Sequence, residues 1–237
     1  RESTVPVMHA LVEAGAEVIE LGVPFSDPMA DGPVIQRSSE RALARGVGLG
    51  FVLDAVREFR TRDADTPVVL MGYLNPVEIR GAQRFAREAV DAGVDGVLLV
   101  DLPPEEDAEF RAAFSEHGLA LILLASPTTT DERLRRLCDH AQGYLYYVSF
   151  AGVTGAERLA TGAASAHLQA IRARSSVPVV AGFGIKDAAS AAAMARQADG
   201  VVVGSALVSV LEAADDPAVR ARAFLAPLRK ALDGLPD

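Results

Sequence analysis

The sequence predicts an α/β fold, a (β/α)8 barrel of the TIM type, and three observations support this. Short apolar runs of strand length alternate with amphipathic stretches of helical period, which is typical of parallel strands joined by helices. A glycine recurs where a helical stretch gives way to an apolar run, at 14–17 and 92–95, and again in outline at 198–200. A doubly wound open sheet would carry a glycine fingerprint after its first strand, and none stands there.

The predicted strands are residues 17–23, 67–73, 96–100, 120–125, 144–149, 177–182 and 200–204. The predicted helices are residues 4–14, 51–62, 83–92, 106–117, 131–141, 166–174 and 188–197. The chain therefore opens on a helix, whereas a closed barrel needs an eighth strand to cover its open edges. We expect one barrel domain over residues 1–237 that lacks its first strand, either because the sequence is truncated at its N-terminus or because the barrel is incomplete.

Composition narrows the class of protein. The 237 residues are half hydrophobic, enough for a large core in one barrel-sized domain or two smaller ones, and the alternation favours one. A net charge of -9 and a pI near 5.0 argue against a nucleic-acid or anionic-membrane surface. Any anionic ligand must therefore be held by local groups.

Cysteine and histidine usage predicts neither disulfides nor a metal site. Cys138 is the only cysteine, which fits a reducing cytoplasm, and we interpret it as a small buried residue on a helix. No secretion signal or membrane-length apolar run is present, so we expect a soluble protein that is not exported. The histidines fall on helical stretches without a second ligand at metal spacing; they are His9, His117, His140 and His167.

Two carboxylates near the end of the first strand form a candidate acid/base site. Glu20 lies among apolar residues, and on a strand buried on both faces its charged form would be disfavoured, which suits a group that gives and takes protons. Asp31 lies on a glycine- and proline-rich loop that could close over a ligand. For Asp31 taken alone, a turn or a cap of the helix opened by Pro33 is the preferred interpretation.

Three glycine-bearing loops follow the last three predicted strands, at 152–155, 181–185 and 203–205. Phosphate sites in barrels lie in such loops, because glycines let backbone N–H groups approach an anion. Ser205 begins a helix, whose N-terminal partial charge favours an anion. Lys186 and Asp187 are interpreted as the solvated start of a helix with no chemical role.

Three further residues could line the site or simply support it. Asp101 ends a strand and therefore faces the functional end of a barrel; loop support or capping is the preferred interpretation, with a site role or a subunit contact left open. Tyr73 and Tyr146 are strand aromatics, which are more often core residues than ligand contacts. Inward positions near the end of a barrel strand do line the pocket, however.

These segments together resemble the tryptophan synthase alpha subunit family, whose members are (β/α)8 barrels. The resemblance spans nearly the whole chain. Its most specific segment is residues 20–32. The supporting segments are residues 71–76, 101–103, 126–129, 152–155 and 182–185.

The resemblance implies retro-aldol cleavage of indole-3-glycerol phosphate to indole and D-glyceraldehyde 3-phosphate. It implies that Glu20 is the acid and base and that Asp31 accepts a hydrogen bond from the indole N–H. The positions that it implies for substrate binding are Leu98, Tyr146, Thr154, Gly155, Phe183, Gly184, Gly204 and Ser205. No cofactor is implied in this chain; an alpha2beta2 complex is implied, with pyridoxal phosphate in the beta subunit and residues 27–31 facing that partner.

Two departures from the family pattern stand out. The expected first strand is missing, and Phe150 stands where some relatives have a polar or basic residue, so loop closure could differ. Two alternatives to the lyase are another phosphate-binding barrel, such as an isomerase or aldolase, and a non-catalytic partner-binding subunit. A Schiff-base aldolase would need a lysine on a strand, and no predicted strand carries one.

Overall fold

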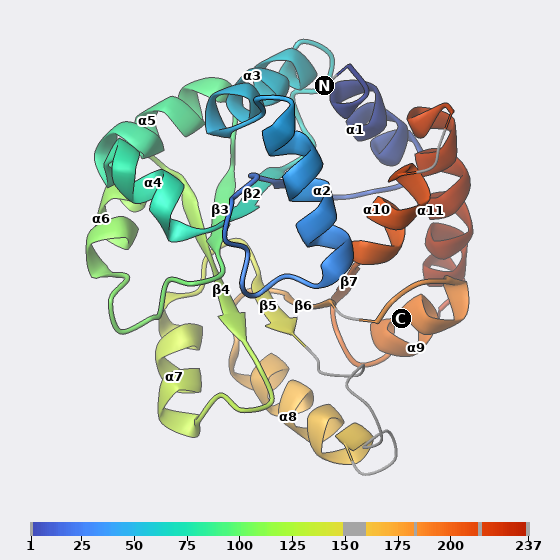
Figure 1. Ribbon diagram of the computed structural model, residues 1–237. Helices are drawn as coiled ribbons and strands as arrows, with labels where there is room; N and C mark the ends of the chain where they lie inside the picture. Colours follow the sequence, from blue (N-terminus) through green and yellow to red (C-terminus); the bar gives the residue numbers. More distant parts are fainter. Residues whose placement is uncertain (1, 149–159, 183, 213–214, 236–237) are drawn as a thin grey trace. The chain divides into compact units, whose positions relative to one another are not determined.

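The computed structural model describes residues 2–148, 160–182, 184–212 and 215–235. The chain divides into two compact units (Figure 1). Unit 1 comprises Arg1–Leu121 and Val208–Ala226, and unit 2 comprises Ile122–Leu207 and Pro227–Asp237.

Unit 1 is built on three parallel strands in chain order. These are β1 (Ile19–Gly22), β2 (Val68–Gly72) and β3 (Gly96–Leu99), with Leu21 opposite Leu70 and Leu70 opposite Val97. Its helices are α1 (Thr4–Glu13), α2 (Pro33–Ala44), α3 (Leu49–Arg60), α4 (Leu74–Arg80), α5 (Ala82–Ala92) and α6 (Ala108–Glu116). The core is packed with fully buried aromatic and aliphatic side chains, among them Phe59, Phe85 and Phe114.

Unit 2 repeats the strand-helix alternation. The strands β4 (Ala120–Ala125), β5 (Leu145–Val148), β6 (Val179–Gly182) and β7 (Gly200–Val202) run parallel in chain order. Their helices are α7 (Asp131–His140), α8 (Ala160–Arg174) and α9 (Ala188–Ala195). The boundaries between the units fall inside β4, α10 (Ser205–Glu212) and α11 (Pro217–Asp233).

The seven predicted strands and the predicted helices are all confirmed, with ends that move by a few residues, and α8 begins earlier than expected. Helix α2 begins at Pro33 and α10 at Ser205, as predicted. Asp187 caps α9 by accepting from the Ser190 backbone N–H at 2.8 Å, which confirms its reading as a helix start. The short helix α4 and the C-terminal helix α11 were not predicted.

Strand β1 is less buried than the sequence suggested. Ile19 is buried, but Glu20 and Leu21 are half-buried and Gly22 is exposed, so the expectation of a strand buried on both faces is wrong for β1. The cause is that, in the described part of the chain, β1 pairs with β2 along one edge only.

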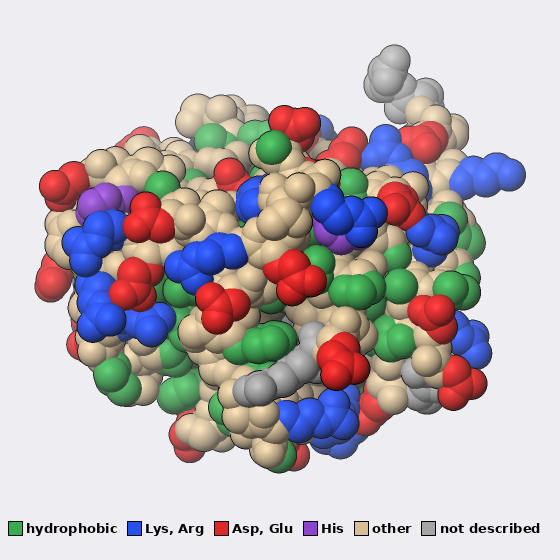
Figure 2. Space-filling model, turned by 90° about the horizontal axis from the view of Figure 1, so that it is seen from above, with side chains coloured by type: hydrophobic (Ala, Val, Ile, Leu, Met, Phe, Trp, Pro, Cys, Tyr) green, Lys and Arg blue, Asp and Glu red, His purple; other side chains and the backbone are tan. Residues whose placement is uncertain are grey.

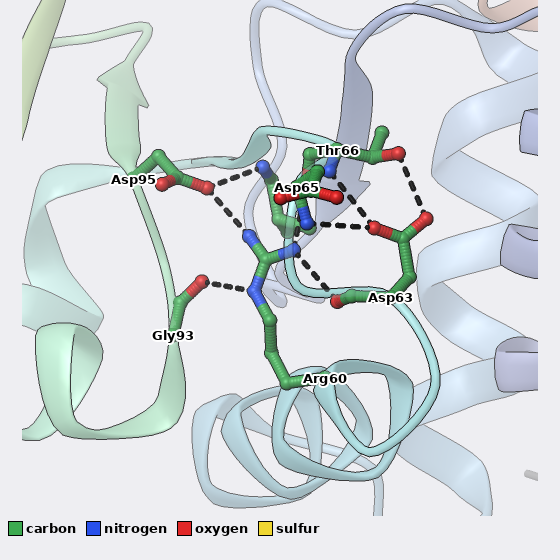
Figure 3. Close-up of polar contacts among 7 residues, drawn as sticks. Arg60, Asp63, Asp65, Thr66, Gly93 and Asp95 are labelled. Atoms are coloured by element: carbon green, nitrogen blue, oxygen red, sulfur yellow. Dashed lines mark hydrogen bonds and ion pairs between the residues drawn. The ribbon is translucent and has the colours of Figure 1, made fainter.

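A polar clamp holds the beginnings of β2 and β3 together in unit 1 (Figure 3). The Asp95 carboxylate accepts from the Val68 backbone N–H at 2.8 Å and from Arg60 Nη2 at 2.6 Å. Arg60 also donates to the carbonyls of Gly93 and Thr66. Gly93 has φ +91°, and a Cβ there would collide with the Arg60 side chain, which explains the glycine that recurs at this step of the sequence.

Unit 2 has the same clamp on β6 and β7. Asp199 accepts from the Val179 backbone N–H at 2.8 Å and from Arg172, which donates in addition to the Gln197 carbonyl at 3.4 Å. Burial of Asp199 opposes its ionisation, but the hydrogen bonds from Arg172 and Val179 outweigh burial and lower the pKa of the carboxyl. The aspartate therefore remains charged and fixes the strand register at neutral pH.

No helix among the described residues is both long enough and apolar enough to cross a bilayer. On the face shown in Figure 2, acidic and basic side chains are interspersed.

Candidate active site

Glu20 is the second residue of β1, opposite Val69 of β2. Its side chain is half-buried. The chain leaves the strand at Val23, whose backbone N–H donates to the Met71 carbonyl at 2.8 Å, and enters the loop that carries Asp31. Of the two predicted catalytic acids, Glu20 therefore lies on β1 itself and Asp31 on the loop that leaves its carboxyl end.

Asp31 is tied to β2 through Tyr73. The Tyr73 hydroxyl donates to Asp31 Oδ2 at 3.1 Å and accepts from the Ala30 backbone N–H at 3.0 Å. Phe25 of the same loop stacks on the Tyr73 ring with centroids 5.2 Å apart. One aromatic side chain therefore fixes both the backbone and the carboxylate of the loop.

The electrostatics of this pair suit a carboxylate that meets a developing positive charge. Burial raises the pKa of Asp31, while the hydrogen bond from Tyr73 lowers it in part. Burial, with the neighbouring Asp31 and Asp101 charges, raises the pKa of Tyr73 to about 12, so its hydroxyl stays protonated and remains a donor. Burial thus disfavours the charged form of Asp31, and a cationic ligand beside the carboxylate would offset that cost.

Two other polar side chains support this corner of unit 1. Gln36, in the first turns of α2, donates from Nε2 to the Asp31 carbonyl at 2.8 Å. Asp101 accepts from the Leu74 backbone N–H at 2.7 Å and so caps α4, directly after Tyr73. The interpretation of Asp101 as loop support or a cap is confirmed.

Unit 2 brings Tyr146 against the end of β6. Tyr146 is 9% exposed, and a Cβ added to Gly182 would collide with its hydroxyl and ring. Position 182 therefore has to be glycine while Tyr146 occupies this place. Gly184, two residues on, has φ +70°, a backbone conformation that side chains rarely adopt.

The start of α10 is open to solvent. Gly204 and Ser205 are both exposed, and a Cβ on Gly204 would meet no atom within 4 Å. The N–H groups of the first turn of α10 can therefore be approached by an anion. Leu98, in contrast, is fully buried in β3 of unit 1.

Some predicted residues lie outside the described part of the chain, namely Phe150, Thr154, Gly155 and Phe183. Within the described part, no group of three or more His, Cys, Asp or Glu side chains is placed to hold a metal ion. The four histidines lie on helices or, for His117, at the C-cap of α6.

Comparison with known proteins decides the family. A family model described as tryptophan synthase alpha chain matches residues 1–233. The chain belongs to this family. The tryptophan synthase alpha chain of Xanthomonas oryzae pv. oryzae (strain MAFF 311018) is 73% identical over 236 residues, which are 98% of this chain and 88% of the relative. That of Xanthomonas campestris pv. campestris (strain B100) is 72% identical, over 98% of this chain and 87% of the relative.

Solved structures agree. The tryptophan synthase alpha subunit of Legionella pneumophila str. Paris superimposes with a TM-score of 0.91 at 49% identity, covering 99% of this chain and 88% of the other. A chain of the a2b2 complex of Pyrococcus furiosus gives a TM-score of 0.88 at 39% identity, covering 97% of this chain and 92% of the other. The predicted barrel class is confirmed, and as a tryptophan synthase alpha chain the protein is a lyase of tryptophan biosynthesis.

For Tyr73 the sequence favours a core position and leaves a place in the pocket lining open. Tyr73 is only 4% exposed, yet its hydroxyl is bonded to Asp31. Gln36 was not singled out at all. The position of each was a signal: Tyr73 directly follows a buried strand, and Gln36 lies five positions after Asp31, near the start of the helix that Pro33 opens.

Proposed function

We propose that this tryptophan synthase alpha chain cleaves indole-3-glycerol phosphate with Glu20 as the acid and base and Asp31 as the partner of the indole N–H. The observation that carries the proposal is the half-buried Asp31 carboxylate, held by Tyr73 at 3.1 Å on the loop that leaves the Glu20 strand. A carboxylate that burial has stripped of water is a strong acceptor for an N–H that becomes acidic.

The reaction needs one proton delivered and one removed. Glu20 in its acid form protonates C3 of the indole, which leaves a positive charge delocalised to the ring nitrogen. The bond between C3 and the side chain then breaks, and its electron pair restores the aromatic ring. The side-chain hydroxyl loses its proton to a base as the aldehyde C=O forms. One carboxyl group can perform both transfers in turn, with no net change in protons.

Asp31 acts on the charged intermediate. Its carboxylate accepts the hydrogen bond from the ring N–H and stabilises the positive charge that C3 protonation creates. Because burial disfavours the lone carboxylate, the interaction is stronger with the cationic ring than with neutral indole. That difference between the two states lowers the barrier.

The phosphate is assigned to unit 2. Gly184, Gly204 and Ser205 would bind it through backbone N–H groups and the serine hydroxyl, together with Gly155 and Phe183. The exposure of Gly204 and Ser205 at the start of α10 supports this. Leu98, Tyr146 and Thr154 are assigned to the indole and the closing loop.

The beta subunit is proposed to dock against the loop of residues 27–31. Met29 on this loop is 86% exposed, and Ile79 on α4 is 80% exposed, which is unusual for large apolar side chains and suits a protein interface. The pyridoxal phosphate that converts indole to tryptophan belongs to that partner. We place the complex in the cytoplasm, which fits the single buried cysteine.

The decisive test is release of glyceraldehyde 3-phosphate from indole-3-glycerol phosphate by the chain and by Glu20→Gln, each with and without a beta subunit. We expect release by the parent and none above background by the variant, at equal beta-subunit affinity. Glu17→Gln, an exposed acid just before β1, is the control and should keep activity. Beta binding without release from the folded parent would favour a non-catalytic subunit and overturn the proposal.

A further inference from the structure

Helix α2 follows Asp31 with Gly32 as its N-cap, yet it is loosely packed. None of its residues is buried. The Arg41 guanidinium pairs with Glu212 of α10 at 2.5 Å, and both side chains are more than a third exposed. An acid in the last turn of α10 is unfavourable for that helix, so Arg41 compensates it.

Gln36 links this helix to the Asp31 loop. Its Nε2 donates to the Asp31 carbonyl at 2.8 Å and lies 3.5 Å from the Pro28 carbonyl. The Gln36 backbone N–H donates to the Gly32 carbonyl at 3.0 Å, which makes the side chain part of the first full turn of α2. Gln36 thus spans the loop that carries the carboxylate.

Two groups from different elements therefore hold Asp31 at its two ends. Tyr73, directly after β2, bonds the carboxylate, and Gln36 from α2 bonds the carbonyl of the same residue. A carboxylate fixed only at its tip could still swing with the backbone. Fixing the carbonyl removes that freedom, and small errors in the placement of a catalytic group are costly to rate.

We propose that Gln36 is a positioning residue for Asp31: from α2 it fixes the Asp31 backbone so that the carboxylate meets the indole N–H. This inference rests on the proposed role of Asp31. Gln36 itself does not touch substrate. It should therefore act on turnover through Asp31 and on nothing else.

The test replaces Gln36 by methionine, which is close in length and shape but has no donor. We expect kcat for indole-3-glycerol phosphate cleavage to fall about tenfold, the cost of a lost hydrogen bond that aligns a reacting group. KM should change less than twofold, because the substrate contacts remain. Arg37→Met, at the next and exposed position of α2, is the matched control and should stay within twofold of the parent.

A double-mutant cycle with Asp31→Asn separates positioning from a merely structural role. If Gln36 acts through Asp31, Gln36→Met should cost about tenfold in the parent and less than twofold in the Asp31→Asn background. Melting temperatures recorded in parallel show whether each variant is folded.

The outcomes are distinct. An unchanged kcat in folded Gln36→Met, or an equal loss in both backgrounds, would overturn the inference while leaving the proposed function intact. No cleavage by the parent, or full activity in Asp31→Asn, would instead show that the proposed function itself has failed.

Discussion

Units 1 and 2 begin their strands with the same clamp, but the more buried of the two arginines lies in unit 1 and the more buried of the two aspartates lies in unit 2. In each, an aspartate accepts from the first backbone N–H of the preceding strand and from an arginine of the helix before that strand. The side chain of Arg60 is 16% exposed and that of Arg172 is 37% exposed. The aspartates differ the other way, with Asp95 53% and Asp199 34% exposed. Loss of the aspartate should therefore leave the more deeply buried guanidinium unpaired in unit 1.

The carboxyl ends of the strands differ in kind. In unit 1 the acids Glu20 and Asp31 lie on β1 and on the loop after it, and the aromatic Tyr73 directly follows β2. In unit 2 glycines take these places: Gly182 ends β6, Gly184 follows it, and Gly204 follows β7. The same frame thus carries the proposed acid-base and charge-stabilising groups in one unit and the proposed phosphate site in the other. Strand starts provide stability and strand ends provide chemistry, as expected of a barrel.

The largest effect is expected from Asp31→Asn in unit 1. Loss of the carboxylate that stabilises the cationic ring should lower kcat about 100- to 1,000-fold, as for other preorganised charge-stabilising groups. Steady-state cleavage of indole-3-glycerol phosphate measures it.

The same variant should not lose stability. The pKa of Asp31 is raised in the folded protein, so folding favours the protonated carboxyl, and ionisation works against folding as the pH rises through that pKa. Above that pKa the penalty is present, and asparagine removes it. A melting temperature at pH 7 well below that of the parent would contradict this account.

The next effect is expected from Gly182→Ala in unit 2. The new methyl group collides with Tyr146, so unfolding free energy should fall by about 1–3 kcal/mol, the usual cost of overpacking. Gly22→Ala is the matched control, because Gly22 ends β1 as Gly182 ends β6 and a Cβ there meets no atom within 4 Å. Tyr146→Leu combined with Gly182→Ala should recover part of the loss in urea unfolding.

The two clamps can be compared directly by alanine. Asp95→Ala and Asp199→Ala should each cost about 1–3 kcal/mol of unfolding free energy, with the larger loss for Asp95 because Arg60 is less exposed than Arg172. Asp95→Asn keeps an acceptor for the Val68 N–H and should cost less than Asp95→Ala. Equal losses at both sites would refute the difference between the units.

The Asp199 clamp also has a pH signature. The pKa of Asp199 is lowered in the folded state. Its contribution to the free energy of unfolding is therefore present above the pKa of the unfolded chain and is lost as the pH falls through the pKa of the folded protein. The stability difference between the parent and Asp199→Asn should therefore shrink in acid. If the stability difference stays constant from pH 7 down to acid unfolding, the charge of Asp199 does not contribute to stability.

The repeated frame could be predicted from sequence because it depends on local signals. Apolar runs predicted all seven strands, and the recurring glycine predicted where a helix gives way to a strand, just before Asp95. Nothing in the sequence pointed to Arg60, the arginine that binds Asp95. Pro33 and Asp187 marked helix starts through their own backbone preferences. Glu20 and Asp31 could be proposed because acids at a strand end are unusual.

The polar contacts around Asp31 could not be predicted, because they join residues that only the fold brings together. Tyr73 is 42 positions from Asp31, and its apolar neighbours in the sequence favour a core position for its ring. The burial of β1 was misjudged for a similar reason, since a strand's exposure depends on which strands lie beside it rather than on its own residues.

The smallest effect compares one tyrosine of each unit. Tyr73→Phe removes the hydrogen bond that lowers the pKa of Asp31, so the acid limb of the pH profile of kcat/KM should move to higher pH. One hydrogen bond is worth about 1 kcal/mol, so the rate at neutral pH should change little. Tyr147→Phe is the control, because the buried Tyr147 hydroxyl has no hydrogen-bond partner among the described residues, and its acid limb should stay where the parent's is. An acid limb that moves to lower pH in Tyr73→Phe would mean that Tyr73 disfavours the Asp31 charge, and the assignment of Tyr73 as its donor would then be wrong.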